Sequence, residues 1–226
     1  GNTSADFQRY SISGNTWSTV GTLANAPATV AHGGSLAFIG NTLYAMGGNA
    51  TTNFWSYDIT QAAPGTWTNL TTTNPFPDTA HSGASLVSDG TYLYATRGAA
   101  TKNFWRYNPA ASSGSRWTLL PYVPNKMGLI AGNSVTRGNI TYCDNCGLGE
   151  IYASSGNGVN GYNGQLSESD TGGLLYRYKI DPNTCSLING LNPGTGSAPC
   201  SGYNTWPIQN RITFATFGIS YGGNLV

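Results

Sequence analysis

Short apolar runs separated by turn-forming residues recur along the chain. The clearest unit has four such runs, at residues 32–39, 43–47, 54–59 and 66–70. The dipeptides between them, Gly40-Asn41, Gly48-Asn49 and Pro64-Gly65, favour tight turns. Long helical patterns are absent from the sequence. The pattern therefore predicts an all-β fold in which each unit forms four short antiparallel strands.

The aromatic residues repeat with a fixed period. Trp17, Trp67 and Trp117 recur every 50 residues. The segment at residues 53–57 (Asn-Phe-Trp-Ser-Tyr) returns at 103–107, with weaker copies at 7–10 and 175–178. Trp206 continues the series after a longer insertion. A repeat of this length with four strands describes one blade of a β-propeller. The repeated aromatic side chains are then expected to pack between neighbouring blades.

The order of residues within a unit resembles the kelch repeat. The matching residues, read from residue 7 to residue 48, are Phe7-x-x-Tyr10, Gly14-Asn15-Thr16-Trp17, a proline-containing loop, His32-Gly33-Gly34 and Leu43-Tyr44-Ala45-Met46-Gly47-Gly48. The second unit, residues 54–98, keeps this order except that Arg97-Gly98 replaces the double glycine. The resemblance implies a kelch-type β-propeller with about four repeats of four antiparallel strands. It also implies that the histidine-bearing strand is innermost and the tryptophan-bearing strand outermost.

We expect residues 1–226 to form a single propeller domain or propeller segment. Its expected parts are a half-blade at 1–20, blades at about 27–70, 78–120 and 126–208, and a second half-blade at 209–226. The two half-blades could close a four-bladed ring. Because kelch propellers usually have about six or seven blades, a segment of a larger ring is the preferred interpretation.

The four cysteines lie where the chain departs from the repeat. Cys185 and Cys200 fall in an insertion between the last two strands of the third blade, and Cys143 and Cys146 in the expanded hairpin between its first two strands. Disulfides within each pair are the preferred interpretation, since each pair shares one inserted loop. A four-thiolate zinc site is the rival, although only one pair has Cys-x-x-Cys spacing. Free thiols are the third alternative, and no metal ligand is assigned.

Composition narrows the classes of function. Charged residues make up 8% of the chain and the net charge is +1, so the surface lacks the positive charge that nucleic-acid binding requires. No apolar run is long enough to span a membrane. Low charge, an even number of cysteines and Asn-x-Ser/Thr sequons favour an exported protein, either extracellular or at the cell surface. The sequons begin at Asn2, Asn49, Asn69 and Asn139.

Catalytic groups are scarce in the sequence. The two histidines, His32 and His81, occupy matching repeat positions, so the repeat explains them better than catalysis does. Copper-radical oxidases of kelch-like fold need a cysteine at the ring axis, whereas all cysteines here lie in third-blade insertions. Residues 156–161 match the dinucleotide fingerprint, but no helix pattern follows to hold a pyrophosphate. We expect no catalytic residue and no cofactor.

Function is expected in residues outside the repeat, which concentrate at 141–149, 159–173 and 184–203. Strand alternation places the first and third segments on one rim of the disc. The preferred interpretation is a noncatalytic binding or structural module of an exported cell-surface or filament protein, contacting a protein partner or another copy through this cysteine-bearing rim. The candidate contacts are Tyr142, Asp144, Asn145, Leu191 and Tyr203. The alternative is a carbohydrate-binding module or carbohydrate-active propeller enzyme, with a glycan held on exposed tyrosine and tryptophan.

Overall fold

The computed structural model describes residues 4–99, 101–123, 139–144, 150–154, 174–180 and 208–211. All regular elements within these ranges are β-strands. The all-β prediction is therefore confirmed for the described part of the chain. A helix that could cross a bilayer does not occur there either.

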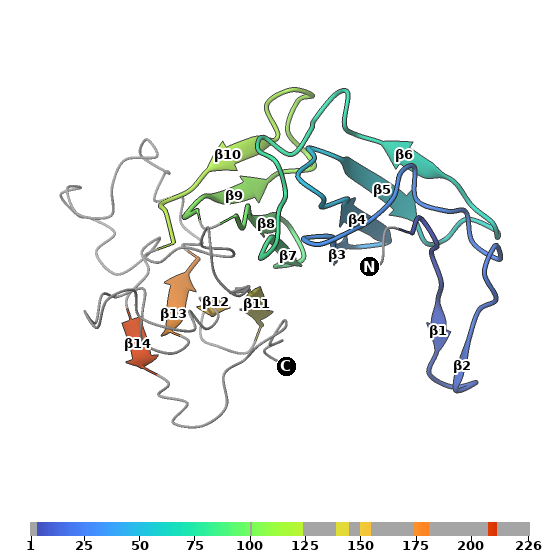
Figure 1. Ribbon diagram of the computed structural model, residues 1–226, viewed down its shortest axis with the longest axis horizontal. Coiled ribbons are helices and arrows are strands. Elements are labelled where there is room, and N and C mark those ends of the chain that lie inside the picture. Colours follow the sequence, from blue (N-terminus) through green and yellow to red (C-terminus); the bar gives the residue numbers. More distant parts are fainter. Residues whose placement is uncertain are drawn as a thin grey trace.

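The strands form three four-stranded antiparallel sheets and one two-stranded hairpin (Figure 1). Sheet 1 contains β3 (Ser35–Ile39), β4 (Thr42–Met46), β5 (Phe54–Asp58) and β6 (Trp67–Asn69). Sheet 2 contains β7 (Ser85–Ser88), β8 (Leu93–Thr96), β9 (Phe104–Tyr107) and β10 (Trp117–Leu119). Sheet 3 contains β11 (Asn139–Cys143), β12 (Glu150–Ser154), β13 (Leu174–Lys179) and β14 (Ile208–Arg211), and the hairpin is β1 (Tyr10–Ser11) with β2 (Thr16–Trp17). In every sheet the strands lie in chain order.

The four runs predicted for residues 32–70 correspond to β3–β6, but β3 begins three residues later than expected. The reason is a turn, in which the Gly34 N–H donates to the Ala31 carbonyl at 2.9 Å. Gly33 lies within this turn with a φ of +82°, and a Cβ there would come within 2.0 Å of the His81 carbonyl oxygen. The glycine therefore permits both the turn and the close approach of the second unit.

Tyrosine–tryptophan pairs mark equivalent strands in consecutive units. The register aligns Tyr10 with Trp17, Tyr57 with Trp67, and Tyr107 with Trp117. The predicted equivalence of the tryptophan-bearing strands is confirmed for these three tryptophans. Trp206 lies outside the described residues.

The first strands of the three sheets lie beside one another in the order β3, β7, β11. A backbone N–H to serine hydrogen bond joins each neighbouring pair: the Leu86 N–H donates to Ser35 Oγ at 2.9 Å, and the Ile140 N–H donates to Ser85 Oγ at 3.4 Å. Figure 1 shows the sheets fanning out from these inner strands, with β6 and β10 on the outer side. This radial arrangement of antiparallel sheets is propeller-like.

Aromatic rings fill the space between consecutive sheets. Phe54 of sheet 1 meets Tyr107 of sheet 2 edge to face, with ring centroids 5.0 Å apart. Phe104 of sheet 2 meets Tyr178 of sheet 3 in the same way at 5.2 Å. Each phenylalanine is fully buried, and each also stacks on a tyrosine of the preceding strand in its own sheet, Tyr44 or Tyr94. The same contact therefore joins successive sheets.

We expect Phe54→Ala to destabilise the protein by about 3–5 kcal/mol, because it removes a fully buried ring that two sheets share. Phe38→Ala is the matched control, since Phe38 lies in the same sheet but is 50% exposed; its cost should stay below about 1 kcal/mol. Urea denaturation of both variants measures the difference. Equal costs for the two variants would contradict the assigned role of the inter-sheet rings.

Candidate functional site

The cysteine-bearing rim is the end of sheet 3 at which β11 finishes. Cys143 on β11 is aligned with Glu150 on β12, and Glu150 with Lys179 on β13. The β11–β12 and β13–β14 connections therefore start at this end of the strands. The β12–β13 connection starts at the opposite end, where Asn139 begins β11. The antiparallel order of the strands thus starts the first and third connections on one rim and the second connection on the other, as predicted from the sequence.

Two of the predicted contact residues lie on this rim within the described residues. Tyr142 is half-buried on β11 and packs against the core between sheets 2 and 3. Asp144 follows β11 directly and is exposed. The other three predicted contacts, Asn145, Leu191 and Tyr203, lie outside the described residues.

Between these two residues, Cys143 is disulfide-bonded. It is the one cysteine among the described residues, so its partner lies outside them. Cys146, Cys185 and Cys200 are outside as well, and the specific pairing stays a prediction. Within the described ranges no cysteine is free and no group of three or more metal-ligating side chains occurs.

A carboxylate of sheet 2 faces the same rim. Asp89, in the turn between β7 and β8, accepts the backbone N–H groups of Thr91 and Tyr92 at 2.8 and 2.6 Å. Its second oxygen accepts the hydroxyl of Tyr94 at 3.0 Å. Burial raises the pKa of Tyr142, and the charges of Asp144 and Asp89 raise it further. We call Asp89, Tyr94, Tyr142 and Asp144 the tyrosine–carboxylate cluster.

The tyrosine hydroxyls and the carboxylates of this cluster have complementary hydrogen-bonding roles. Burial raises the pKa of Tyr94, and the Asp89 carboxylate adds to the shift. Both tyrosines therefore keep their protons at neutral pH and act as hydrogen-bond donors, whereas the carboxylates are acceptors. This arrangement can bind polar groups of a partner but offers no general base among the tyrosines.

Further polar side chains border the cluster. The Arg106 guanidinium lies over the ring of Tyr92, with Cζ 4.6 Å from the ring centroid. The Tyr152 hydroxyl donates to Glu150 at 2.7 Å, and Glu150 is buried. Sequence reasoning missed Asp89, Arg106 and Glu150. The Asp89-Gly90 turn was the one signal available, because an aspartate at this place commonly binds its own turn.

The opposite rim carries a second polar group. The Arg97 guanidinium lies 2.9 Å from Asp78, which also accepts the side-chain amide of Asn103 at 2.7 Å. Arg97 replaces the first glycine of the pair in the second unit, so the sequence marked its position without indicating its partner. His32 and His81 lie before the first strands of their sheets, with ring centroids 6.2 Å apart. The prediction that they occupy matching repeat positions is wrong by one residue. The Ala31 and His81 carbonyls accept the equivalent turn N–H groups of Gly34 and Ala84, whereas the His32 carbonyl accepts the Asn49 N–H as the Ser82 carbonyl accepts that of Ala99. His81 therefore matches Ala31, and His32 matches Ser82.

The predicted sequons differ in their surroundings. Asn49 and Asn69 are exposed. Asn139 is half-buried, and its side-chain oxygen accepts the Ser85 hydroxyl at 2.5 Å. Asn2 lies outside the described residues. Among the three sequons that the structure describes, Asn139 is therefore the least accessible to a glycan, and occupancy of each stays a prediction.

We expect the stability of the protein to fall as the pH rises above about 10, the pKa of tyrosine in an unfolded chain. The native state holds the Tyr94 proton beyond this pH because its pKa is raised, so the unfolded state binds fewer protons and is favoured by alkali. Tyr94→Phe removes this contribution and should show a smaller alkaline loss of unfolding free energy. Urea titrations at about pH 8 and 10.5 measure it, with the exposed Tyr122→Phe as control. An identical loss in parent and Tyr94→Phe would contradict the assignment.

Neither the protein-family models nor the curated proteins include a match to this chain. Among solved structures it is similar to that of YjhT, with a TM-score of 0.45 and 20% sequence identity. The likeness covers 78% of this chain and 56% of the other, so this chain spans about half the length of that protein. At this TM-score the likeness identifies neither a family nor an activity.

Proposed function

We propose that the chain is a noncatalytic binding or structural module with a kelch-type propeller fold, part of an exported cell-surface or filament protein. Its cysteine-bearing rim contacts a protein partner, which includes the case of a second copy of the chain. The observation that carries this proposal is the arrangement at the end of β11. There a disulfide-bonded Cys143 stands between a half-buried Tyr142 and an exposed Asp144.

This arrangement suits a binding surface for two reasons. Tyrosine is enriched at the centre of protein interfaces, where its ring is buried and its hydroxyl finds a partner. The register between β11 and β12 is continuous from Asn139 to Cys143, and the disulfide fixes the strand end further. A preorganised contact loses less conformational entropy when a partner binds.

The kelch part of the proposal is supported by the packing of the repeated glycines. A Cβ on Gly48 would lie 2.5 Å from the Gly34 nitrogen and the His32 carbonyl oxygen. A Cβ on Gly98, its counterpart in the second unit, would lie 2.3 Å from the Ser82 carbonyl oxygen. Both units therefore require glycine at the same place, next to the innermost strand, which is the position of the second glycine in the kelch pattern.

Export is supported by chemistry at the surface of the described residues. A disulfide at Cys143 is the form of cysteine that oxidising compartments maintain. Exposed sequon residues at Asn49 and Asn69 would be accessible to a glycan. These features favour an extracellular or cell-surface protein.

The carbohydrate alternative has one observation in its favour. Trp17 is 66% exposed, and its ring lies 5.2 Å from that of Tyr10, centroid to centroid. Exposed aromatic rings of this kind can stack on a sugar. A glycan array distinguishes the two candidates, because a module that binds proteins only should bind none of the immobilised glycans.

We expect the double variant Tyr142→Ala/Asp144→Asn to associate at least about tenfold more weakly than the parent chain, since removing an interface tyrosine costs about 1–2 kcal/mol or more. Sedimentation velocity of the full chain over a range of concentrations measures its self-association. Lys102→Ala is the control, because Lys102 is exposed on the opposite rim, between β8 and β9.

Two results would count against the proposal. Unchanged association of the double variant would exclude the cysteine-bearing rim as the contact surface. A parent chain that stays monomeric at every concentration but binds on the glycan array would favour the carbohydrate alternative.

A further inference from the structure

The β1–β2 hairpin has the geometry of the outer half of a sheet. Its Tyr10–Trp17 pairing matches the pairing between the third and fourth strands of sheets 1 and 2. Phe7, just before β1, meets Tyr57 edge to face at 5.3 Å and Trp67 at 5.0 Å. Phe54 makes the corresponding contacts with sheet 2. Residues 7–17 therefore occupy the place of a third and fourth strand that precede sheet 1.

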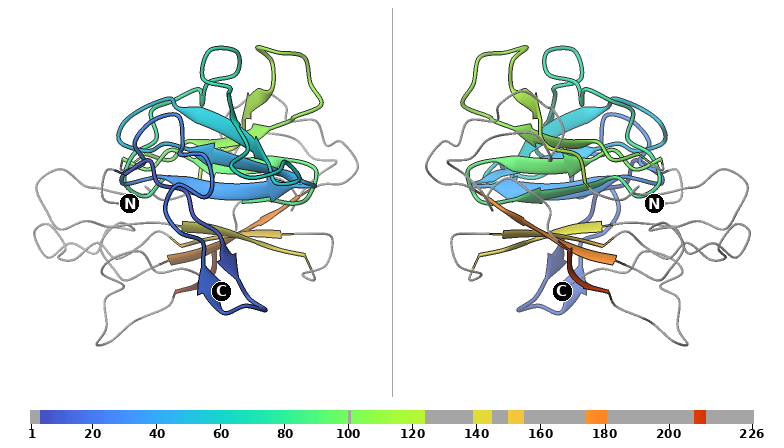
Figure 2. Two further views of the ribbon diagram at one scale, coloured as in Figure 1. Left: turned by 90° about the vertical axis from the view of Figure 1, so that its right-hand side faces the viewer. Right: turned by 90° about the vertical axis from the view of Figure 1, so that its left-hand side faces the viewer.

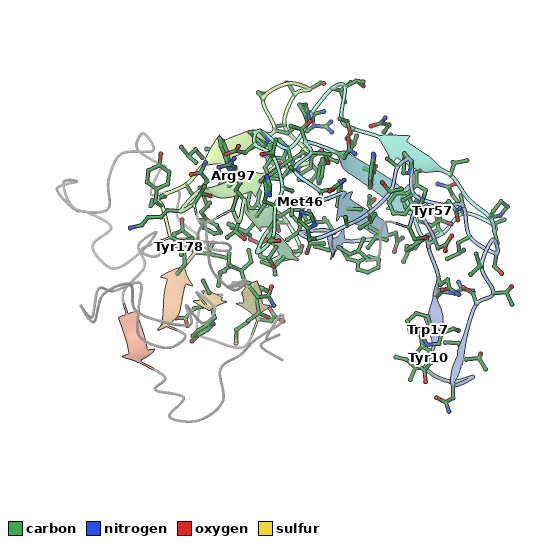
Figure 3. All side chains as sticks on the ribbon, viewed as in Figure 1. Tyr10, Trp17, Met46, Tyr57, Arg97 and Tyr178 are labelled. Atoms are coloured by element: carbon green, nitrogen blue, oxygen red, sulfur yellow. The ribbon has the colours of Figure 1, made fainter. Side chains whose placement is uncertain are left out.

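The place of the first two strands of that sheet is unfilled among the described residues. In both views of Figure 2 the hairpin projects away from sheet 1, and Figure 3 shows Tyr10 and Trp17 side by side on it, apart from the other labelled side chains. Trp17 is 66% exposed, whereas its equivalents Trp67 and Trp117 are half-buried.

The facing side of sheet 1 is exposed as well. Leu36 and Phe38 on β3 are 54% and 50% exposed. Leu86, which holds the position of Leu36 in the next unit, is only 3% exposed because it packs against sheet 1. Leu86 has a preceding sheet to pack against, whereas the described residues place no first or second strand of a preceding sheet beside Leu36.

The edge of β1 opposite β2 carries backbone groups that can pair. The Arg9 carbonyl accepts the Ser18 N–H at 2.8 Å, so the backbone groups of Arg9 point toward β2. In an antiparallel ladder alternate residues point to opposite edges, so Gln8 and Tyr10 present theirs at the other edge. Among the described residues β1 pairs with β2 alone. An edge of this kind is a template for a further strand.

We propose that the β1 edge and the exposed face of β3 together form an acceptor surface for a two-stranded β-hairpin with the sequence pattern of β3–β4. The second strand of the incoming hairpin pairs with Gln8 and Tyr10, as Ala45 and Leu43 of β4 pair with β5. Its first strand lies beside β3, as β3 lies beside β7. A single strand would pair with β1 but leave Leu36 exposed, so two strands are required.

The repeat also specifies two side chains of the incoming hairpin. The first strand carries a serine whose Oγ accepts the Leu36 N–H, as Ser35 accepts that of Leu86 at 2.9 Å. The second strand carries a tyrosine that stacks on Phe7, as Tyr44 stacks on Phe54 with centroids 5.9 Å apart and an interplanar angle of 16°. Main-chain pairing supplies affinity and these two side chains supply selectivity.

The first test uses a synthetic peptide that copies residues 34–47 of this chain, which includes both Ser35 and Tyr44. Added to the full chain, it should slow amide hydrogen exchange of Gln8, Tyr10 and Leu36 at least about tenfold. A control peptide with Ser35→Ala and Tyr44→Ala should protect them markedly less. The Tyr142→Ala/Asp144→Asn variant should bind the peptide as the parent does, which separates this surface from the cysteine-bearing rim.

Because an isolated hairpin can fail to fold, a second variant carries the same segment fused directly before Gly1. In this fusion the copied Met46 precedes Phe7 by the same number of residues as Met46 precedes Phe54 in the chain. The fusion should raise the melting temperature by several degrees and shield Trp17 from an aqueous fluorescence quencher, whereas the fusion with both alanines should do so less. Success of the fusion alone still supports the proposal. It is overturned if neither the peptide protects these amides nor the fusion raises the melting temperature above that of its alanine control.

Discussion

The edge-to-face contact between a phenylalanine of one unit and a tyrosine of the next is the interaction on which the rest of the structure depends. Within the part of the chain that the structure describes it occurs three times, as Phe7–Tyr57, Phe54–Tyr107 and Phe104–Tyr178, with centroid distances of 5.3, 5.0 and 5.2 Å. A four-stranded sheet cannot bury both of its faces alone, so each unit is ordered by its neighbour. On β3, where the described residues supply no first or second strand of a preceding sheet, Leu36 and Phe38 are 54% and 50% exposed.

Because packing constrains the faces of the sheets, the rims are free to vary. The turn glycines and inner serines recur with the aromatic rings, whereas Asp89, Arg97 and Tyr142 lie at strand ends and connections where the repeat is broken. Connections held by a rigid scaffold are where binding residues concentrate. The tyrosine–carboxylate cluster, with a disulfide-bonded Cys143 beside it, is such a place.

Sequence reasoning succeeded where a position repeats and failed where it does not. The tyrosine–tryptophan pairs could be predicted because each copy meets the same packing requirement, and the strands of the first complete unit followed from them. The Asp78–Arg97 ion pair and the Ser85–Asn139 hydrogen bond join residues far apart in sequence and have no counterpart in the other described units, so no periodic signal marks them. The rim position of Tyr142 was predictable from strand alternation, but its neighbour Asp89 comes from another sheet and depends on how the sheets pack.

A double-mutant cycle on Phe54 and Tyr107 tests this account most directly. The free energy of unfolding is measured for the parent chain, Phe54→Leu, Tyr107→Leu and the double variant. If the ring contact couples sheets 1 and 2, the two substitutions should show an interaction energy of about 0.5–1.5 kcal/mol. Additivity within about 0.3 kcal/mol would show that the two rings fill space independently, and would contradict the claim that this contact joins the units.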